Sequence, residues 1–191
     1  MTSRLHALPR RWFLTDARLG ETVWAVLAGL PLDVGVIVRV KDLKRDRALA
    51  RQLIAACRKR GLTVLLAGPV REAQRLRADG AHLAEAQTRR GSNRRPRSGF
   101  LLTAAAHSRP ALIRAARLGV DGAFLSPVFP TRSHPNARTF GAVRFGLLKQ
   151  GLSVRVLALG GMDETSAIRL APLRPYGWGA IDAWAQARPA K

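Results

Sequence analysis

The sequence predicts an α/β protein with a single (β/α)8 barrel domain spanning residues 1–191. Three observations point to this fold: short apolar runs recur along the chain, helical patterns lie between several of them, and no linker or internal repeat divides the sequence. Strands that are apolar without alternation are typical of a parallel sheet buried on both faces. The alternative for the same order of elements is an open, doubly wound sheet.

Eight apolar runs are the predicted strands. They lie at residues 12–15, 34–40, 62–66, 81–83, 100–103, 123–125, 154–159 and 179–181. In a barrel built from these strands, the residues that carry chemistry gather where the strands end and the following loops begin.

Between the strands, apolar side chains recur at helical spacing. The clearest stripes lie within residues 45–60, 112–118 and 167–170. Residues 21–30 must serve as the first helix although they contain Gly29, and an arginine-rich loop at 86–98 occupies the place of the fourth. Cys57 falls on the apolar stripe of its helix, so we interpret it as a core residue.

The chain is strongly basic. It has 33 lysines and arginines against 12 aspartates and glutamates, a net charge of +21. This balance favours anionic partners such as phosphorylated metabolites, nucleic acid or anionic lipid. Arginine enrichment from a GC-rich genome is an equally good explanation. The 86–98 loop has no aromatic residue for base stacking, so the nucleic-acid indication is nonspecific.

Membrane, secreted and disulfide-rich classes are not expected. The longest apolar stretch, residues 23–32, is about half of what a bilayer span needs. Residues 1–11 are basic and lack the apolar segment of a secretory signal. The single cysteine excludes a disulfide framework and a multi-cysteine metal site. We therefore expect a cytoplasmic protein.

Two cations stand at the end of the second strand. Arg39 and Lys41 are two residues apart, so in an extended strand they share a face. Cations buried inside a barrel need an anion to neutralise them. The alternative is that the strand has already ended and both side chains face solvent.

Two further segments suit phosphate binding. Gly160-Gly161 follows the seventh predicted strand and precedes a helix that starts near Asp163, a residue typical of an N-cap. Backbone N–H groups at these glycines can approach an anion. A tight connection between the strand and the helix explains the two glycines equally well. The loop at 126–135 carries hydroxyls, a cation and an imidazole; its other interpretation is a surface loop. The phosphate-binding candidates are Thr131, Ser133, His134, Gly160 and Gly161.

Histidines provide the remaining candidates. His107 lies just beyond another strand end, although a lone histidine is more often structural or exposed than catalytic. His82 sits within an apolar run, and we interpret it as a packed barrel residue. No cluster of His, Cys, Asp and Glu has metal-site spacing, so we predict no metal ligand.

Taken together, these segments resemble the thiamine phosphate synthase family and its sister group, the TenI thiazole tautomerases. The resemblance covers most of the chain in order. It rests on residues 13–16 (FLTD), 38–41 (VRVK), 78–83 (ADGAHL), 106–108 (AHS), 119–123 (GVDGA), 126–131 (SPVFPT) and 158–162 (ALGGM).

The resemblance implies a TIM barrel that takes phosphorylated small molecules. The synthase joins aminopyrimidine-methyl pyrophosphate to thiazole phosphate and releases pyrophosphate, with magnesium and basic residues stabilising the leaving group. It implies catalytic roles for Arg39, Lys41 and His107, and a phosphate-holding role for the Gly-Gly turn. A homo-oligomer is compatible with it.

The chain departs from the family pattern at several site positions. Ile37 replaces a glutamine, and Ala67-Gly68 replaces the Asn-Asp pair that supplies a magnesium ligand. Gln87 stands for the second magnesium aspartate, with Glu85 nearby, and Asp182 replaces the serine that closes the phosphate site. A carboxylate there repels phosphate unless it is paired.

Magnesium is therefore expected from the family although its ligands are not retained. Glu85, Arg132, His134 or an arginine of the 86–98 loop would have to replace the missing groups of a synthase. Two other functions stay open: a tautomerase that uses His107 as acid and base without magnesium, and a non-catalytic barrel that binds a phosphorylated ligand or nucleic acid.

Overall fold

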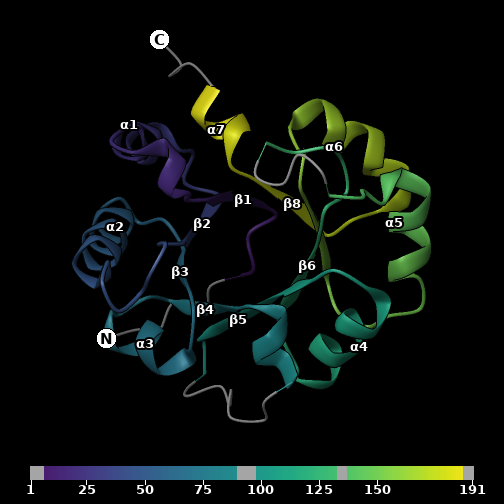
Figure 1. Cartoon of the computed structure of the whole chain (residues 1–191), viewed down its shortest axis with the longest axis horizontal. Helices are drawn as coiled ribbons and strands as arrows, with labels where there is room; N and C mark the ends of the chain where they lie inside the picture. Colours follow the sequence, from purple (N-terminus) through teal and green to yellow (C-terminus); the bar gives the residue numbers. More distant parts are fainter. Residues whose placement is uncertain (1–6, 90–97, 133–136, 187–191) are drawn as a thin grey trace.

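Eight parallel strands close into a barrel in the computed structural model, which describes residues 7–89, 98–132 and 137–186 (Figure 1). The strands are β1 (Arg11–Leu14), β2 (Val34–Val38), β3 (Val64–Ala67), β4 (Gly80–Leu83), β5 (Leu101–Ala106), β6 (Gly122–Leu125), β7 (Val156–Leu159) and β8 (Gly177–Ala180). Each strand pairs with the next, and β8 pairs with β1, where Trp12 faces Gly179. The predicted (β/α)8 barrel is confirmed, and the open sheet is excluded.

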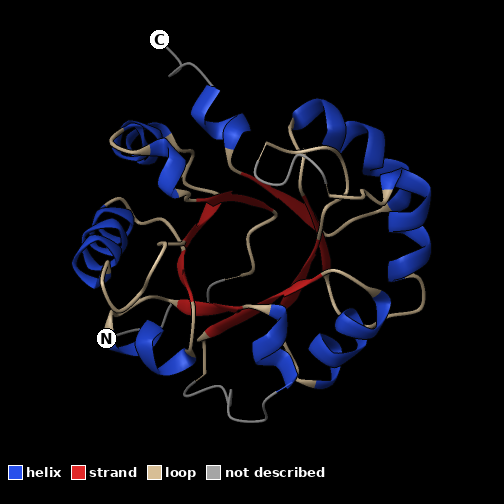
Figure 2. Ribbon diagram, viewed as in Figure 1, coloured by secondary structure: helices blue, strands red, loops and turns tan. Residues whose placement is uncertain are grey.

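Helices surround the barrel on its outside (Figure 2). The α-helices are α1 (Thr22–Gly29), α2 (Arg47–Lys59), α3 (Val70–Arg75), α4 (Arg109–Arg117), α5 (Gly141–Lys149), α6 (Glu164–Leu170) and α7 (Asp182–Gln186). Short 3-10 helices are η1 (Ala17–Leu19), η2 (Glu85–Arg89) and η3 (Ala171–Leu173). None of the helices in the described ranges has the length and hydrophobicity that crossing a bilayer requires.

Two differences from the sequence-based expectations concern the site. The second strand ends at Val38, so the expected strand conformation through Val40 was wrong, and Arg39 begins the following loop. After β4, the described start of the expected loop forms a 3-10 helix, η2, where irregular chain was expected. Residues 90–97 of the arginine-rich loop lie outside the described residues.

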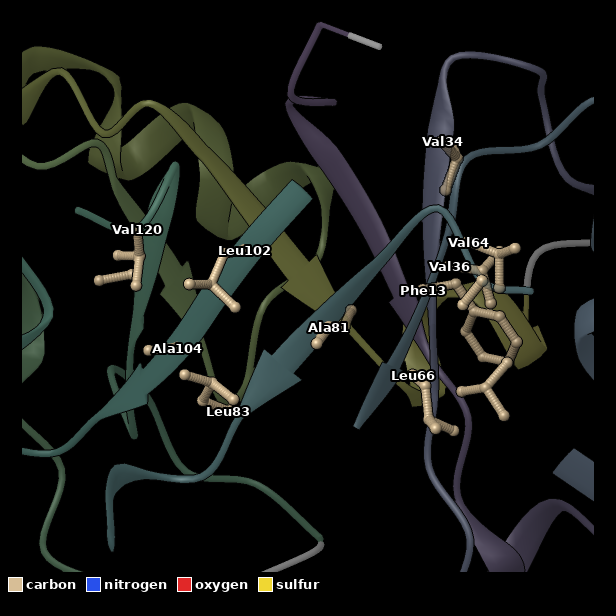
Figure 3. Packing of buried hydrophobic residues seen from close by; sticks show 14 of the residues in the cluster. Phe13, Val34, Val36, Val64, Leu66, Ala81, Leu83, Leu102, Ala104 and Val120 are labelled. Atoms are coloured by element: carbon tan, nitrogen blue, oxygen red, sulfur yellow. The ribbon is translucent and has the colours of Figure 1, made fainter. Parts of the chain in front are cut away.

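The alternation of side chains along the strands builds two layers of core. Phe13, Val36 and Leu66 point outward and pack under the helices (Figure 3). Trp12 and Phe124 belong to the smaller cluster that fills the barrel interior, and their rings meet edge to face with centroids 5.9 Å apart. This packed interior leaves space for a ligand only at an end of the barrel.

Candidate active site

A cavity of about 800 Å³ opens where the strands end. Its walls come from residues at or just beyond the carboxyl ends of the strands. They include Leu14, Arg39, Ala67, His82, Ala84, Ala105, His107, Ser126, Leu159, Gly160, Ala180 and Asp182. This is the end of a (β/α)8 barrel at which active sites form.

The cavity brings together most of the predicted site residues that the structure describes. Arg39, His107, Thr131 and the Gly160-Gly161 turn all line it. Lys41 is exposed and does not line the cavity, so its side chain and that of Arg39 do not share a strand face. Ser133 and His134 lie outside the described residues.

Arg39 is held at the cavity wall by its own backbone. Its N–H donates to Thr15 Oγ1 at 2.8 Å, and the Thr15 hydroxyl donates to the Arg39 carbonyl oxygen at 2.9 Å. Thr15 is buried at the end of β1, so this reciprocal pair fixes the start of the loop after β2. The Arg39 guanidinium is half-buried and forms no ion pair within the described residues, which leaves it available to an anion.

His107 presents one ring nitrogen for chemistry. Its Nδ1 lies 2.9 Å from the Ser126 carbonyl oxygen. A carbonyl oxygen can only accept, so Nδ1 carries the proton and the neutral ring keeps Nε2 as an acceptor. The His107 N–H donates to Glu85 Oε2 at 3.0 Å, and Glu85 Oε1 accepts from Arg114 Nη2 at 2.8 Å. The ring and its backbone are therefore both positioned.

His82 forms part of the cavity floor as a neutral group. Its Nδ1 lies 2.9 Å from Thr103 Oγ1, and its ring meets Phe124 edge to face at 5.3 Å. Burial, together with the positive charge of Arg39, lowers the pKa of His82 from 6.5 to about 3. The interpretation of His82 as a packed barrel residue is confirmed.

The Gly-Gly turn lies against the loop that follows β6. Gly160 and Gly161 have φ angles of +90° and +61°. A Cβ on Gly161 would lie 2.3 Å from the carbonyl oxygen of Pro130. Val128 N–H donates to the Leu159 carbonyl at 2.9 Å, and Phe129 N–H to the Gly160 carbonyl at 3.0 Å. Close backbone packing thus requires these glycines, and the same packing sets the turn against the cavity.

Comparison with known proteins now identifies the family. A family model described as thiamine monophosphate synthase matches residues 13–177. The chain belongs to this family. It is similar to a putative thiamine-phosphate synthase 2 of Aquifex aeolicus, with 33% identity over 162 residues, which cover 81% of this chain and 86% of the relative.

A second relative agrees with the thiamine monophosphate synthase assignment, and a solved structure agrees with the fold. A thiamine-phosphate synthase of Bacillus velezensis is 26% identical over 144 residues, 74% of this chain and 64% of the relative. The solved structure of thiamine phosphate pyrophosphorylase from Pyrococcus furiosus superposes with a TM-score of 0.72 at 21% identity, covering 94% of this chain and 89% of that one. At this identity the structural likeness shows the fold.

At the positions to which the family resemblance assigns magnesium carboxylates, this chain has other residues. Ala67 and Gly68 occupy the first position, and the Gln87 side chain accepts from the Ala84 N–H at 2.8 Å. The Glu85 oxygens face Arg114 and the His107 N–H, and Glu85 does not line the cavity. No group of three His, Cys, Asp or Glu residues suited to a metal occurs in the described ranges. These residues do not fit magnesium, which prefers carboxylate oxygen.

Two carboxylates of the described residues do line the cavity, and both are already engaged. Asp163 caps α6 by accepting from the Ser166 N–H at 2.7 Å, as predicted, and this hydrogen bond lowers its pKa. Asp182 Oδ1 lies 3.8 Å from Arg18 Nη2. Arg18 also forms an ion pair with Asp16 at 2.9 Å. Burial raises the pKa of Asp16, but the hydrogen bonds and the positive charge of Arg18 have the larger effect, so the pKa is lowered overall. Asp182 is therefore paired, which reduces its repulsion of a phosphate.

The sequence did not indicate two contributions to this site. Gln186 lines the cavity from α7, a five-residue helix too short for a periodic pattern. The Thr15–Arg39 pair was also missed, because it joins residues 24 positions apart. Thr15 stood in one of the segments that carry the family resemblance, and this was the available signal.

Proposed function

We propose that this chain acts in thiamine biosynthesis as a transferase of the thiamine phosphate synthase type, joining aminopyrimidine-methyl pyrophosphate to thiazole phosphate. The supporting observation is a cavity of about 800 Å³ that is lined by the Gly-Gly turn and by Arg39, a cation without an ion pair among the described residues. A cavity of this volume falls in the range of small-molecule sites. Family membership supports the substrate class.

In this reaction the carbon–oxygen bond to pyrophosphate breaks, and the thiazole nitrogen bonds to the pyrimidine methylene carbon. Negative charge develops on the departing pyrophosphate, so a fixed cation in a partly enclosed site stabilises the transition state. Arg39 is suited to this role, and Arg132 lines the same cavity. No protein nucleophile is required, because binding positions the two reactants.

His107 supports a second candidate, isomerisation of a thiazole phosphate. The Ser126 carbonyl fixes the proton on Nδ1, which leaves Nε2 to move a proton at the cavity. This chemistry needs no carboxylate-bound metal, in keeping with the residues at positions 67, 68 and 87. The thiazole phosphate site would be common to both reactions.

Activity assays distinguish the two candidates. Purified protein is incubated with both phosphorylated precursors, with magnesium or with EDTA, and thiamine phosphate is quantified; thiazole phosphate isomers are followed separately by NMR. We expect Arg39→Gln to lower kcat/KM for coupling by about 10²–10³-fold. His107→Gln should abolish isomerisation while leaving coupling measurable.

Arg51→Gln is the matched control, since Arg51 is exposed on α2 and away from the cavity. Failure of the folded wild-type protein to form either product would overturn both activities. Stabilisation by a phosphorylated ligand without turnover would then indicate a binding protein. We expect the protein to work in the cytoplasm on phosphorylated small molecules, and a homo-oligomer remains a prediction.

A further inference from the structure

A second pocket, of about 330 Å³, lies at the opposite end of the barrel from the candidate active site. Its lining residues precede β1, β7 and β8: Arg10 stands before β1, Arg155 before β7, and Arg174 with Tyr176 before β8. Lys149, at the end of α5, completes the basic wall. Because the barrel is parallel, these are the amino ends of the strands.

Within the described part of the chain, the pocket wall carries four cations and no carboxylate. Its remaining lining residues are apolar side chains and Tyr176. No described Asp or Glu forms an ion pair with Arg10, Lys149, Arg155 or Arg174. Like charges gathered in a concave surface repel one another, and concavity focuses their field. An anion in the pocket would relieve that repulsion.

Tyr176 holds two of these cations in place. The guanidinium carbon of Arg10 lies 5.1 Å from the ring centroid, and that of Arg155 lies 5.2 Å from it. The two charges are therefore no more than about 10 Å apart, within the screening length of ~0.1 M salt. The Tyr176 hydroxyl donates to the Leu8 carbonyl at 2.7 Å, which anchors the ring. The ring thus positions both cations without a carboxylate that a ligand would have to displace.

We propose that this pocket is a phosphate-binding site, distinct from the candidate active site, for a ligand carrying at least two negative charges. Guanidinium groups bind phosphate oxygens through paired, charge-assisted hydrogen bonds. The required chemistry is that of two or more neighbouring phosphate groups, either in a free oligophosphate or as successive phosphodiesters of a nucleic-acid backbone. The amino end of such a barrel ordinarily serves stability, and mutual repulsion among four cations works against it.

Binding of inorganic pyrophosphate, measured by calorimetry, tests the proposal. We expect Arg10→Gln/Arg155→Gln to weaken one class of sites at least about tenfold, because charge-assisted contacts are lost. Lys149→Gln/Arg174→Gln should do the same without touching the Tyr176 ring. Arg51→Gln/Arg71→Gln removes the same charge from exposed positions on α2 and α3 and should bind like wild type.

The outcomes separate this site from the active site. If Arg39→Gln alone removes all pyrophosphate binding and both pocket variants bind like wild type, the pocket proposal is overturned while the proposed function stands. Equal losses in the Arg51→Gln/Arg71→Gln control would also overturn it, since general charge would then explain the binding. If the folded wild-type protein binds no pyrophosphate, the pocket proposal is likewise overturned.

A labelled 12-nucleotide oligothymidylate distinguishes the two sources of phosphate. If the ligand is a nucleic-acid backbone, the Arg10→Gln/Arg155→Gln protein should show a salt dependence reduced by about 0.7 in logarithmic slope per lost phosphate contact. If the ligand is a free oligophosphate, pyrophosphate binding should depend on the pocket and oligothymidylate binding should not.

Discussion

A neutral imidazole at the floor of the cavity makes the folded protein sensitive to acid. Burial lowers the pKa of His82 to about 3, whereas the same group in the unfolded chain titrates near 6.5. Between these values the unfolded chain binds a proton that the folded chain does not. The contribution of His82 to stability is therefore complete above pH 6.5 and is lost as the pH falls toward 3.

His82→Gln tests this linkage. Glutamine can keep a hydrogen bond to Thr103 and has no proton to gain, so the free energy of unfolding of the variant should fall less steeply between pH 6.5 and 4. The difference in slope should approach about 1.4 kcal/mol per pH unit. Denaturant titrations across this pH range provide the measurement. Parallel curves for both proteins would refute the assignment.

At the scale of single residues, the sequence predicted which residues contribute to the site better than it predicted where their side chains point. Arg39 was expected at the end of the second strand, where active-site residues of a barrel gather, and it does line the cavity. Lys41 was paired with it on the assumption that the strand continued, but the strand ends at Val38. The residue at which the strand conformation ends, and with it the alternation of side chains between the two faces, is visible only in the backbone geometry. The ion pair between Asp182 and Arg18 likewise joins η1 and α7, which lie far apart in the sequence.

Among the elements, the turn between β7 and α6 requires glycine for two reasons at once. Gly161 combines a φ of +61° with backbone so close that an added Cβ would lie 2.3 Å from the Pro130 carbonyl oxygen. Gly151 has a φ of +70°, and nothing lies within 4 Å of the position that a Cβ there would occupy. The pair thus separates conformational strain from steric overlap.

Alanine substitutions at these two glycines should differ in cost. Gly151→Ala should lower the free energy of unfolding by about 1 kcal/mol, the strain of a left-handed residue. Gly161→Ala should cost about 1–3 kcal/mol more, because the Pro130 backbone has to move. Thermal and denaturant unfolding measure both values. Equal decreases in the free energy of unfolding would show that the loop between β6 and α5, which contains Pro130, moves away from the added Cβ at no cost in free energy.

The strands were predictable because each is a continuous apolar run, and every predicted strand overlaps an observed one. Helices with a strong apolar stripe, such as α2, were predicted for the same reason. The helices α3 and α5 were not: α3 has six residues, and α5 exposes Val143 and Leu147, so neither shows one clear apolar face. These two helices form because they pack against the barrel, and this contact is not visible in the sequence.

The whole molecule carries a net charge of +21. Repulsion among so many cations disfavours the compact state and is screened by salt. Raising NaCl from about 0.01 M to about 0.1 M shortens the screening length from about 30 Å to about 10 Å. We expect the Tm to rise, by about 2–4 °C for each kcal/mol gained.

Scanning calorimetry at several NaCl concentrations checks this expectation. Ion pairs such as that between Arg47 and Glu72, 3.0 Å apart, weaken with salt and act in the opposite direction. A Tm that stays constant or falls would mean that such local pairs dominate the electrostatic stability of the fold.

The pairing of β8 with β1 also bears on how the chain is made. Trp12 faces Gly179 across the closing seam, and the Trp184 indole donates to the Trp12 carbonyl at 2.9 Å. Until residues 177–180 have been synthesised, the first strand has no partner on that side, and β7 is an edge as well. Unpaired strand edges are templates for association between chains. A nascent chain that stalls before β8 should therefore need chaperone protection, whereas the closed barrel leaves none of its eight strands with an open edge.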